Sequence, residues 1–462
     1  MTQAIQQKLS ESKAARFTAL IIVSATMMFA YFFTDVMSPL EDMLNRDLQW
    51  NGSEYGFFSG AYGLINVFLL MLFFGGIILD KMGIRFTGLM STGLMLAGAL
   101  IKWYAVTYVP TDTIVDWFHL HLVIINIDAP HLSCLIASLG FAIYGVGCEI
   151  AGITVSKVIV KWFTGHELAL AMGLQVALAR FGTLFAMWFS LPIANHMGGI
   201  STSIGLGASL LCAALLAFMY YCTMDKKLDA SSESAQGAAA EEAEEGFKLN
   251  DLKILVTNPG FWIICLLCLM FYGGVFPFLK FATKLMIVKY GVEADFAGII
   301  PGLIPVGTMI LTPLFGSIYD KKGHGVILML IGSVLLTIVH VCFALPILGV
   351  WWFAVLVMIV LGFAFSLVPS AMWPSVPKII PMKLLGSAYA MIFFIQNIGL
   401  SLIPMGIGEV NQSNTSADGI TDYTTSMSIF AVFGIVSILL SLLLLSLDKK
   451  KGYGLEKPNV KK

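Results

Sequence analysis

Charged residues are scarce in this chain of 462 residues. Lysine, arginine, aspartate and glutamate together make up 12% of it, against 58% for hydrophobic residues. Soluble globular proteins carry about 25% charged residues, so this composition excludes an ordinary soluble domain and indicates a membrane protein. The formal net charge is −1, and the absence of a basic excess argues against a nucleic-acid partner.

The sequence also lacks the patterns of disulfide scaffolds, metal centres and enzymes. Its seven cysteines lie in or at the ends of apolar runs, as small buried hydrophobic residues do. The CxxC pattern of Cys265 and Cys268 falls inside such a run. No Walker loop, zinc-ligand spacing or nucleophile elbow is present, and no strands are evident. We therefore expect no cofactor, no metal and no enzymatic activity.

What the chain has instead is a series of apolar runs of the length that a bilayer-spanning helix needs, about 20 residues. The first run follows a polar N-terminus and has no small-residue cleavage site, so it is predicted to be a helix rather than a signal peptide. Twelve transmembrane helices are predicted, over residues 17–37, 54–79, 84–107, 132–160, 167–195, 200–223, 258–288, 293–319, 325–346, 350–377, 384–410 and 424–447.

One long polar stretch divides this series into two sets of six. Residues 224–257 are rich in Ala, Ser and Glu and predict an acidic cytoplasmic linker. We expect an N-terminal six-helix bundle over 1–223, a C-terminal six-helix bundle over 258–447 and a cytoplasmic tail over 448–462. An insertion over 104–131 is expected on the outer side, either as a lid or as tolerated surface.

Lysine and arginine are distributed unequally between the two sides of the predicted membrane. With the N-terminus inside, the inside segments hold all but six of the 27 basic residues. The exceptions are Arg46, Lys102, Arg180, Lys280, Lys284 and Lys289. Because positive loops stay in the cytoplasm, both termini are predicted to be cytoplasmic.

A short motif repeats at the same place in each half. Residues 76–83 read GIILDKMG and residues 316–323 read GSIYDKKG, each at the inner end of the second helix of its half. Equal position and orientation predict two parallel six-helix repeats related by an axis along the membrane normal. In the second copy, His324 and Gly325 stand where a further basic residue is expected.

Two charges lie alone in apolar runs, Glu149 within residues 132–156 and Arg180 within residues 168–194. Each costs about 2.5–3.5 kcal/mol in mid-membrane on insertion scales. Both lie about 15 residues from the turn near Thr164 and Gly165, hence ~23 Å from it at ~1.5 Å per residue. They share one depth and either neutralise each other or form a split site for a zwitterion, with Glu149 for an ammonium and Arg180 for a carboxylate.

Polar and aromatic residues in other helices are candidates for the lining of a substrate cavity, although each could equally make a helix–helix hydrogen bond. These candidates are Tyr62, Asn66, Tyr272, Gln396 and Asn397, with Trp373 as a gate residue or an interface anchor. The glycines and proline in FYGGVFP, and Pro369, Pro374 and Pro377, are expected to bend or unwind helices. Asp35 is expected to be exposed to water. Lys280, Lys284 and Lys289 are expected to extend their ammonium groups to the membrane interface.

The segment GGIILDKMGIR resembles the signature loop of the major facilitator superfamily. That resemblance assigns a gating role to Gly76, Asp80, Lys81, Gly83, Arg85 and, in the second copy, Asp320. An aspartate there can pair across the boundary between the halves and hold one state of the gate.

A narrower resemblance covers most of the chain. The segments GVGCEIAGITVSKVIVKWFTGHELALAMGLQVALARFGT, FYGGVFPFLKFATKLMIVKYG, SAMWPSVPKIIP and LGSAYAMIFFIQNIGLS are similar to the lysosomal dipeptide uniporters of that superfamily. The resemblance implies a secondary transporter that moves dipeptides by alternating access, in which Glu149 and Arg180 engage the peptide's amino and carboxyl termini.

Two other functions stay open, a proton-coupled transporter of another small organic anion or amphiphile, and a non-transporting receptor or scaffold. The expected partners are the lipid bilayer and a small peptide, with no nucleic acid and no obligatory protein partner, although a lysosomal protein could have an accessory membrane subunit. No sorting signal is visible in the N-terminal segment. We therefore expect a bacterial cytoplasmic membrane first and a lysosomal membrane second.

Overall fold

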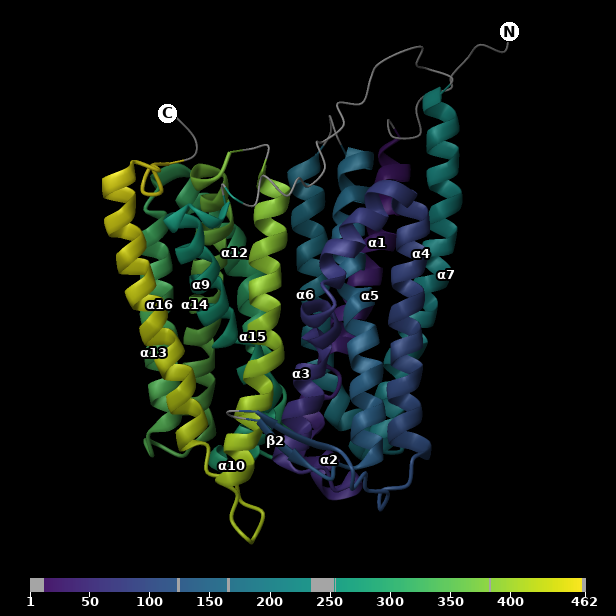
Figure 1. Cartoon of the computed structure of the whole chain (residues 1–462), viewed down its shortest axis with the longest axis vertical. Helices are drawn as coiled ribbons and strands as arrows, with labels where there is room; N and C mark the ends of the chain where they lie inside the picture. Colours follow the sequence, from purple (N-terminus) through teal and green to yellow (C-terminus); the bar gives the residue numbers. More distant parts are fainter. Residues whose placement is uncertain are drawn as a thin grey trace.

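The computed structural model describes residues 12–122, 125–163, 167–233, 253, 255–381 and 384–458, which are mostly helical. The elements of the N-terminal half are α1 (Lys13–Asp35), η2 (Ser38–Leu40), α2 (Glu41–Leu48), α3 (Gly52–Phe68), α4 (Met71–Tyr108), β1 (His119–Leu122), β2 (Ile125–Asp128), α5 (Leu132–Phe163), α6 (Leu168–Met197) and α7 (Ile200–Glu233). Those of the C-terminal half are α9 (Pro259–Gly273), α10 (Phe276–Tyr290), α11 (Ala294–Ala297), α12 (Leu303–Lys322), α13 (Gly325–Ala344), α14 (Trp351–Ile379), α15 (Leu385–Ser413) and α16 (Thr424–Lys451). The halves stand side by side (Figure 1).

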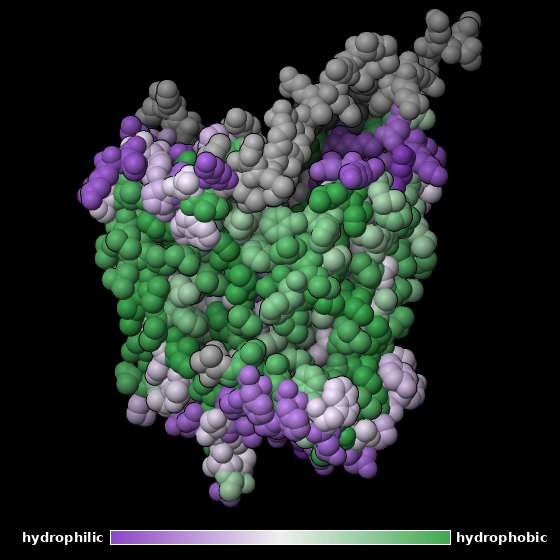
Figure 2. Space-filling view, in the orientation of Figure 1, coloured by the Kyte–Doolittle hydropathy of each residue, from purple (hydrophilic) through white to green (hydrophobic). Residues whose placement is uncertain are grey.

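The helices account for all twelve predicted spans. Eleven stretches of the described residues are long and apolar enough to cross a membrane. One of them, α4, is divided at Gly83, whose backbone is non-helical (φ 77°, ψ 174°). Its first part continues α3 as the second predicted span and its second part is the third. On the face that Figure 2 shows, a broad hydrophobic band lies between two polar ends, as a bilayer-embedded protein requires.

The seventh and the second predicted spans are each interrupted by a break between two helices. The seventh breaks between Gly273 and Phe276, where α9 ends and α10 begins, which confirms the bend predicted from FYGGVFP. The second breaks between Phe68 and Met71, where Leu70 adopts a left-handed conformation (φ 53°); no glycine or proline signals this break. Helix α14, by contrast, runs unbroken through its three prolines.

The two ends of the molecule differ. Helix α1 begins and α16 ends at the same end, uppermost in Figure 1, which we term the terminal face. The opposite end, the distal face, carries η2, α2, the β1–β2 hairpin and the 414–423 turn (Figure 1). Helix α7 continues to Glu233, beyond the predicted start of the linker at 224. Residues 234–252 of that linker, and the predicted turn at 164–165, lie outside the described residues.

The expectation that the chain contains no strands is wrong. Within the 104–131 insertion, β1 and β2 pair as an antiparallel hairpin with His119 opposite Asp128. In β2, Ile125 and Ile127 are buried and pack with Met405 of α15, whereas Asn126 and Asp128 face outward. The alternation of INID is a strand pattern of period two, but four residues are too few to stand out beside helical runs.

The halves meet directly at the distal face through α3 and α15. Glycines at nearly every fourth position of α3 (Gly52, Gly56, Gly60) place its backbone against α15. A Cβ added to Gly60 would lie 2.1 Å from the backbone oxygen of Ser401. The Ser401 hydroxyl donates to the Gly60 carbonyl at 2.8 Å. Only residues without side chains allow so close an approach, and the contact closes the distal face.

Candidate functional site

A cavity of about 2950 Å³ lies between the two halves. Residues from both line it, including Tyr31 and Met27 of α1 and Phe365 of α14. The lining continues to the terminal ends of α5 and α7 through Lys161 and Asp229. The cavity is therefore accessible from the terminal face, while the α3–α15 contact closes it on the other side.

Glu149 of α5 faces this cavity and is held by a neighbouring tyrosine. The Tyr62 hydroxyl of α3 donates to Glu149 Oε1 at 2.9 Å. Asn397 of α15, in the opposite half, lines the same cavity. The glycine-rich helix allows this arrangement, since a Cβ on Gly145 would lie 2.1 Å from the Tyr62 carbonyl oxygen.

Arg180 of α6 faces the same cavity within a group of aromatic rings. Its guanidinium carbon lies 5.5 Å from the ring centre of Tyr31, 5.6 Å from that of Phe276 and 5.7 Å from that of Phe365. Such contacts stabilise a guanidinium without neutralising it. Among the described residues no ion pair joins Arg180 to Glu149, so the two charges stand separately on the lining.

Aromatic and amide side chains of the C-terminal half form the facing wall. Trp373 Nε1 donates to the Tyr272 hydroxyl at 2.9 Å, and the Trp373 ring stacks on Phe393 with ring centres 5.0 Å apart. Gln396 and Asn397 also line the cavity. Asn397 Nδ2 donates to a backbone carbonyl within α15, whereas its Oδ1 has no hydrogen-bond partner in the part of the chain that the structure describes.

The structure brings seven of the eight predicted substrate-site residues to this cavity and leaves one outside it. Asn66 is 1% exposed and is not among the lining residues. Among the described residues, neither its Nδ2 nor its Oδ1 has a hydrogen-bond partner. Its position in α3, just before the break at Phe68, places it within the N-terminal half.

The first copy of the repeated motif lies where the cavity reaches the terminal face. Gly76, Asp80, Lys81, Gly83 and Arg85 all line it. In this conformation the motif aspartate Asp80 pairs with Lys157 of α5 at 2.8 Å. That partner belongs to the same half, so this pair does not join the halves in this state.

A buried carboxylate beside the motif was not singled out from the sequence. Asp225 of α7 is 1% exposed and pairs with Lys161 at 2.8 Å and with Arg85 at 3.6 Å. Asp229, one turn later, binds Arg85 at 3.0 Å and Lys161 at 2.8 Å. The one-turn spacing of Asp225 and Asp229 on α7, opposite Arg85 on α4 and Lys161 on α5, becomes a signal only once these helices are known to be adjacent.

The second copy is covered by the end of the chain. Asp320 lies in the last turn of α12 and is not among the cavity residues. Beyond it, the His324 backbone N–H donates to the Glu456 carbonyl at 3.0 Å. The Glu456 side chain accepts from the Val326 N–H at 2.7 Å, which caps the start of α13. The two copies of the motif therefore have different surroundings.

Ion pairs whose side chains are largely shielded from water join the halves at the closed end of the cavity. Lys280 of α10 binds Asp35 of α1 at 2.7 Å and also donates to the Ser38 hydroxyl. Lys284 pairs with Glu41 at 3.5 Å. The expectation that Lys280 and Lys284 extend to the membrane interface is wrong, because this face of α10 is turned toward α1, η2 and α2 rather than toward lipid. Asp35 and Lys280 also line the cavity.

Residues in short helices and at helix ends add a second set of contacts across the distal face. Asp295 of α11 accepts from Asn195 at 2.6 Å and interacts with His196 at 2.7 Å, both at the end of α6. These hydrogen bonds lower the pKa of the Asp295 carboxyl, since they stabilise its charged form. The Gly52 backbone N–H also donates to Gln412 Oε1 at 2.7 Å.

Two six-helix halves around a charged cavity that is closed at one end define a multi-pass membrane transporter rather than an enzyme. Comparison with known proteins agrees. A family model described as Major Facilitator Superfamily matches residues 20–404, and the chain belongs to that family. The fold is also that of a solved nucleoside transporter, NupG, with a TM-score of 0.68 at 16% identity over 93% of this chain and 98% of that one.

Curated relatives are similar over most of their length. The protein named lysosomal dipeptide transporter MFSD1 from Bos taurus is 26% identical over 416 residues, covering 86% of this chain and 80% of the relative. Its counterpart from Homo sapiens is 26% identical over 415 residues, covering 87% and 81%. The predicted superfamily and the similarity to this group are thus confirmed.

Proposed function

We propose that this protein moves dipeptides across the membrane by alternating access, as a uniporter. The observation that carries the proposal is the presence of two opposite charges, Glu149 and Arg180, on one cavity without an ion pair between them. A dipeptide zwitterion offers an ammonium to the carboxylate and a carboxylate to the guanidinium, which can bind it bidentately. The similarity to proteins named as dipeptide transporters supports this substrate class.

The geometry suggests how such a site selects by backbone length. Two fixed charges measure the separation of the peptide's termini, whereas a wide cavity accommodates varied side chains. Tyr62 orients Glu149 by its hydrogen bond. Tyr272, Trp373, Gln396 and Asn397 lie on the facing wall, where a bound peptide would contact both halves.

We further infer that the terminal face is cytoplasmic, because most lysines and arginines lie in the segments on that side. In that orientation the structure is the inward-open state. Two membranes are proposed as the location of the protein, a bacterial cytoplasmic membrane first and a lysosomal membrane second. The names of the relatives favour the second.

Reconstitution in liposomes tests the function. We expect uptake of dipeptides but not of free amino acids or tripeptides, unchanged by a pH gradient. Glu149→Gln and Arg180→Ala should each abolish uptake. The exposed Glu293→Gln and Arg46→Ala are matched controls that should retain it. Uptake that persists in both cavity variants would overturn the split site, and dependence on the gradient would establish proton coupling instead.

A further inference from the structure

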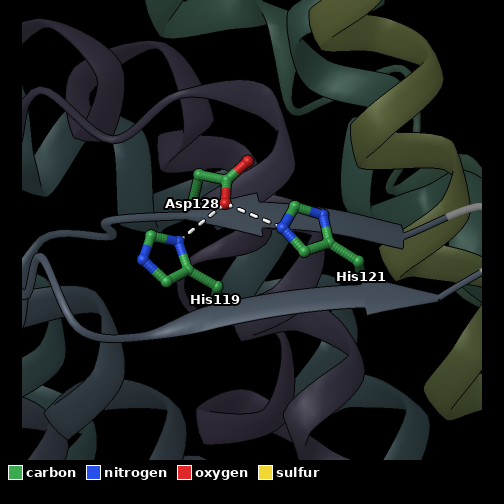
Figure 3. A group of neighbouring side chains, drawn as sticks. All are labelled: His119, His121 and Asp128. Atoms are coloured by element: carbon green, nitrogen blue, oxygen red, sulfur yellow. Dashed lines mark hydrogen bonds and ion pairs between the residues drawn. The ribbon is translucent and has the colours of Figure 1, made fainter.

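Two histidines and an aspartate gather on the exposed face of the β1–β2 hairpin (Figure 3). His119 and His121 are alternate residues of β1, so their side chains point to one face of the strand. Asp128 lies directly opposite His119 in β2. His119 Nδ1 lies 2.8 Å and His121 Nε2 lies 3.1 Å from the same oxygen, Asp128 Oδ1.

We propose that His119, His121 and Asp128 form a binding site for a divalent transition-metal ion, with zinc as the ion that fits best. Their potential ligand atoms all lie within 4.8 Å of one another. Zinc binds imidazole nitrogen at about 2.0–2.1 Å and carboxylate oxygen at about 2.0–2.2 Å, and many zinc sites have three protein ligands and a water. Those bond lengths place tetrahedral ligands about 3.3 Å apart, so small side-chain rotations admit the ion.

The donor set distinguishes zinc from the common hard cations. Calcium takes six to eight oxygen ligands and magnesium a nearly octahedral set of oxygens. This hairpin offers two imidazoles and a single carboxylate. Nitrogen-rich sets of this kind suit zinc, copper and nickel, and the carboxylate neutralises part of the ion's charge.

The neighbouring residues hold the ligands in place. The amide oxygen of Asn126 lies 3.3 Å from His121 Nδ1, so this nitrogen can donate its proton and leave Nε2 free to bind the metal. A second hydrogen bond on a ligating histidine orients the ring in this way in known metal sites. On the other face of the hairpin, Ile125 and Ile127 are 3% and 2% exposed, which fixes the backbone beneath the three ligands.

The position of the hairpin gives the site a further consequence. Ile125, Ile127 and Met405 form one buried cluster, with Phe57 of α3 and Leu402 of α15 packed against it. A metal that ties β1 to β2 would therefore stiffen a segment lying across the junction of the two halves. The binding itself does not depend on the proposed transport of dipeptides.

Zinc titration of the purified full-length protein, with isothermal calorimetry as the readout, tests the site. We expect one site per chain in the micromolar range or tighter, without comparable binding of magnesium or calcium. His119→Ala, His121→Ala and Asp128→Asn should each weaken zinc at least tenfold. Asn126→Ala, which removes only the orienting amide, should weaken it about tenfold. Cobalt bound in place of zinc should give visible absorption bands that are lost in the same variants.

His324→Ala is the matched control, since His324 also lies exposed beside a carboxylate, that of Glu456, at 3.3 Å. It should bind zinc as the unaltered protein does. Thermal unfolding without metal identifies any variant that fails to fold. The cobalt spectrum of the unaltered protein tests the site even if every variant fails to fold. An unaltered protein that binds no zinc at 100 μM, or equal binding by the His119→Ala and His121→Ala variants, would overturn the proposal.

Discussion

At the scale of single residues, Glu149 and Arg180 show how two isolated charges can be kept available in a membrane protein. Each is stabilised by a neighbour that does not neutralise it: Tyr62 donates a hydrogen bond to Glu149, and aromatic rings surround Arg180. A direct ion pair would have to be broken before a substrate could bind. The tyrosine hydroxyl therefore matters for affinity more than for folding.

Replacing Tyr62 with phenylalanine isolates that hydroxyl. Hydrogen bonds to charged groups contribute about 1.5–3 kcal/mol, so Tyr62→Phe should lower kcat/KM for dipeptide uptake roughly tenfold or more, chiefly through KM. Uptake kinetics in liposomes measure the change. Tyr104→Phe, at an exposed position of α4, should leave them unaltered. A normal KM in Tyr62→Phe would mean that Glu149 needs no orienting partner.

The ion pair between Asp35 and Lys280 also depends on single residues, and it joins the two halves. The side chains are 12% and 13% exposed, and removing one partner of a buried pair costs about 3–5 kcal/mol. Asp35→Asn and Lys280→Gln should therefore each lower the apparent thermal unfolding midpoint. The exchanged pair, Asp35→Lys with Lys280→Asp, should recover part of the loss.

Arg46→Gln provides the reference for that experiment, because Arg46 pairs with Asp47 at an exposed site. Exposed pairs contribute about 0–1 kcal/mol, so its midpoint should hardly move. If the single changes at Asp35 and Lys280 behave like Arg46→Gln, the pair does not stabilise the closed distal face.

The sequence predicted which residues are unusual, but not which residues they meet. Glu149 and Arg180 stand out because a charge in an apolar run is rare. Lys280 was assigned to the lipid interface, since nothing near it in sequence shows that α10 faces α1. Asp225 lies in a polar segment where one more acidic residue is not informative. Partners of this kind depend on how helices far apart in the chain are arranged.

At the scale of elements, glycine decides where helices can touch. The close contact of α3 with α15 requires Gly60, since a Cβ there would lie 2.1 Å from a backbone oxygen of Ser401. Backbone cannot yield as a flexible side chain does, so the helices would have to separate. Overpacking of this kind typically costs about 1–3 kcal/mol.

Gly60→Ala should therefore destabilise the closed distal face. We expect a lower thermal unfolding midpoint, reduced dipeptide uptake and greater access of water-soluble reagents to a cysteine introduced at the distal end of the cavity. Gly93→Ala is the matched control, because nothing lies within 4 Å of the Cβ that it adds in α4. Equal behaviour of the two variants would show that α3 and α15 can separate without cost.

Helix breaks illustrate the limits of prediction at this scale. The break at Gly273 was predicted because glycine and proline weaken a helix by known mechanisms. The break at Leu70 has no such signal, and a leucine in a left-handed conformation costs about 1–2 kcal/mol, which the surrounding helices must offset. The β1–β2 hairpin was missed because its strands are too short for their alternation to be recognised.

At the scale of the whole molecule, contacts between the halves at the distal face contrast with a cavity open at the terminal face. Glycine packing, the Asp35–Lys280 pair and the α6–α11 hydrogen bonds all lie on the closed side. In the terminal region, the ion pairs that Asp80, Arg85 and Lys161 form with other described residues stay within the N-terminal half. Alternating access requires the contacts at the distal face to open and new contacts between the halves to form at the terminal face.

A reversible cross-link across the distal face tests that requirement. A Cβ on Gly52 would lie 3.1 Å from the backbone nitrogen and 3.2 Å from the side-chain Oε1 of Gln412, so cysteines introduced at these two positions would lie next to each other across the distal face. Gly52→Cys with Gln412→Cys should lose dipeptide uptake on oxidation and regain it on reduction. Peptide binding, measured by thermal stabilisation, should persist in the oxidised protein, because the cavity stays open at the terminal face. Each single cysteine variant should transport under both conditions, and full uptake by the cross-linked protein would show that the distal face need not open.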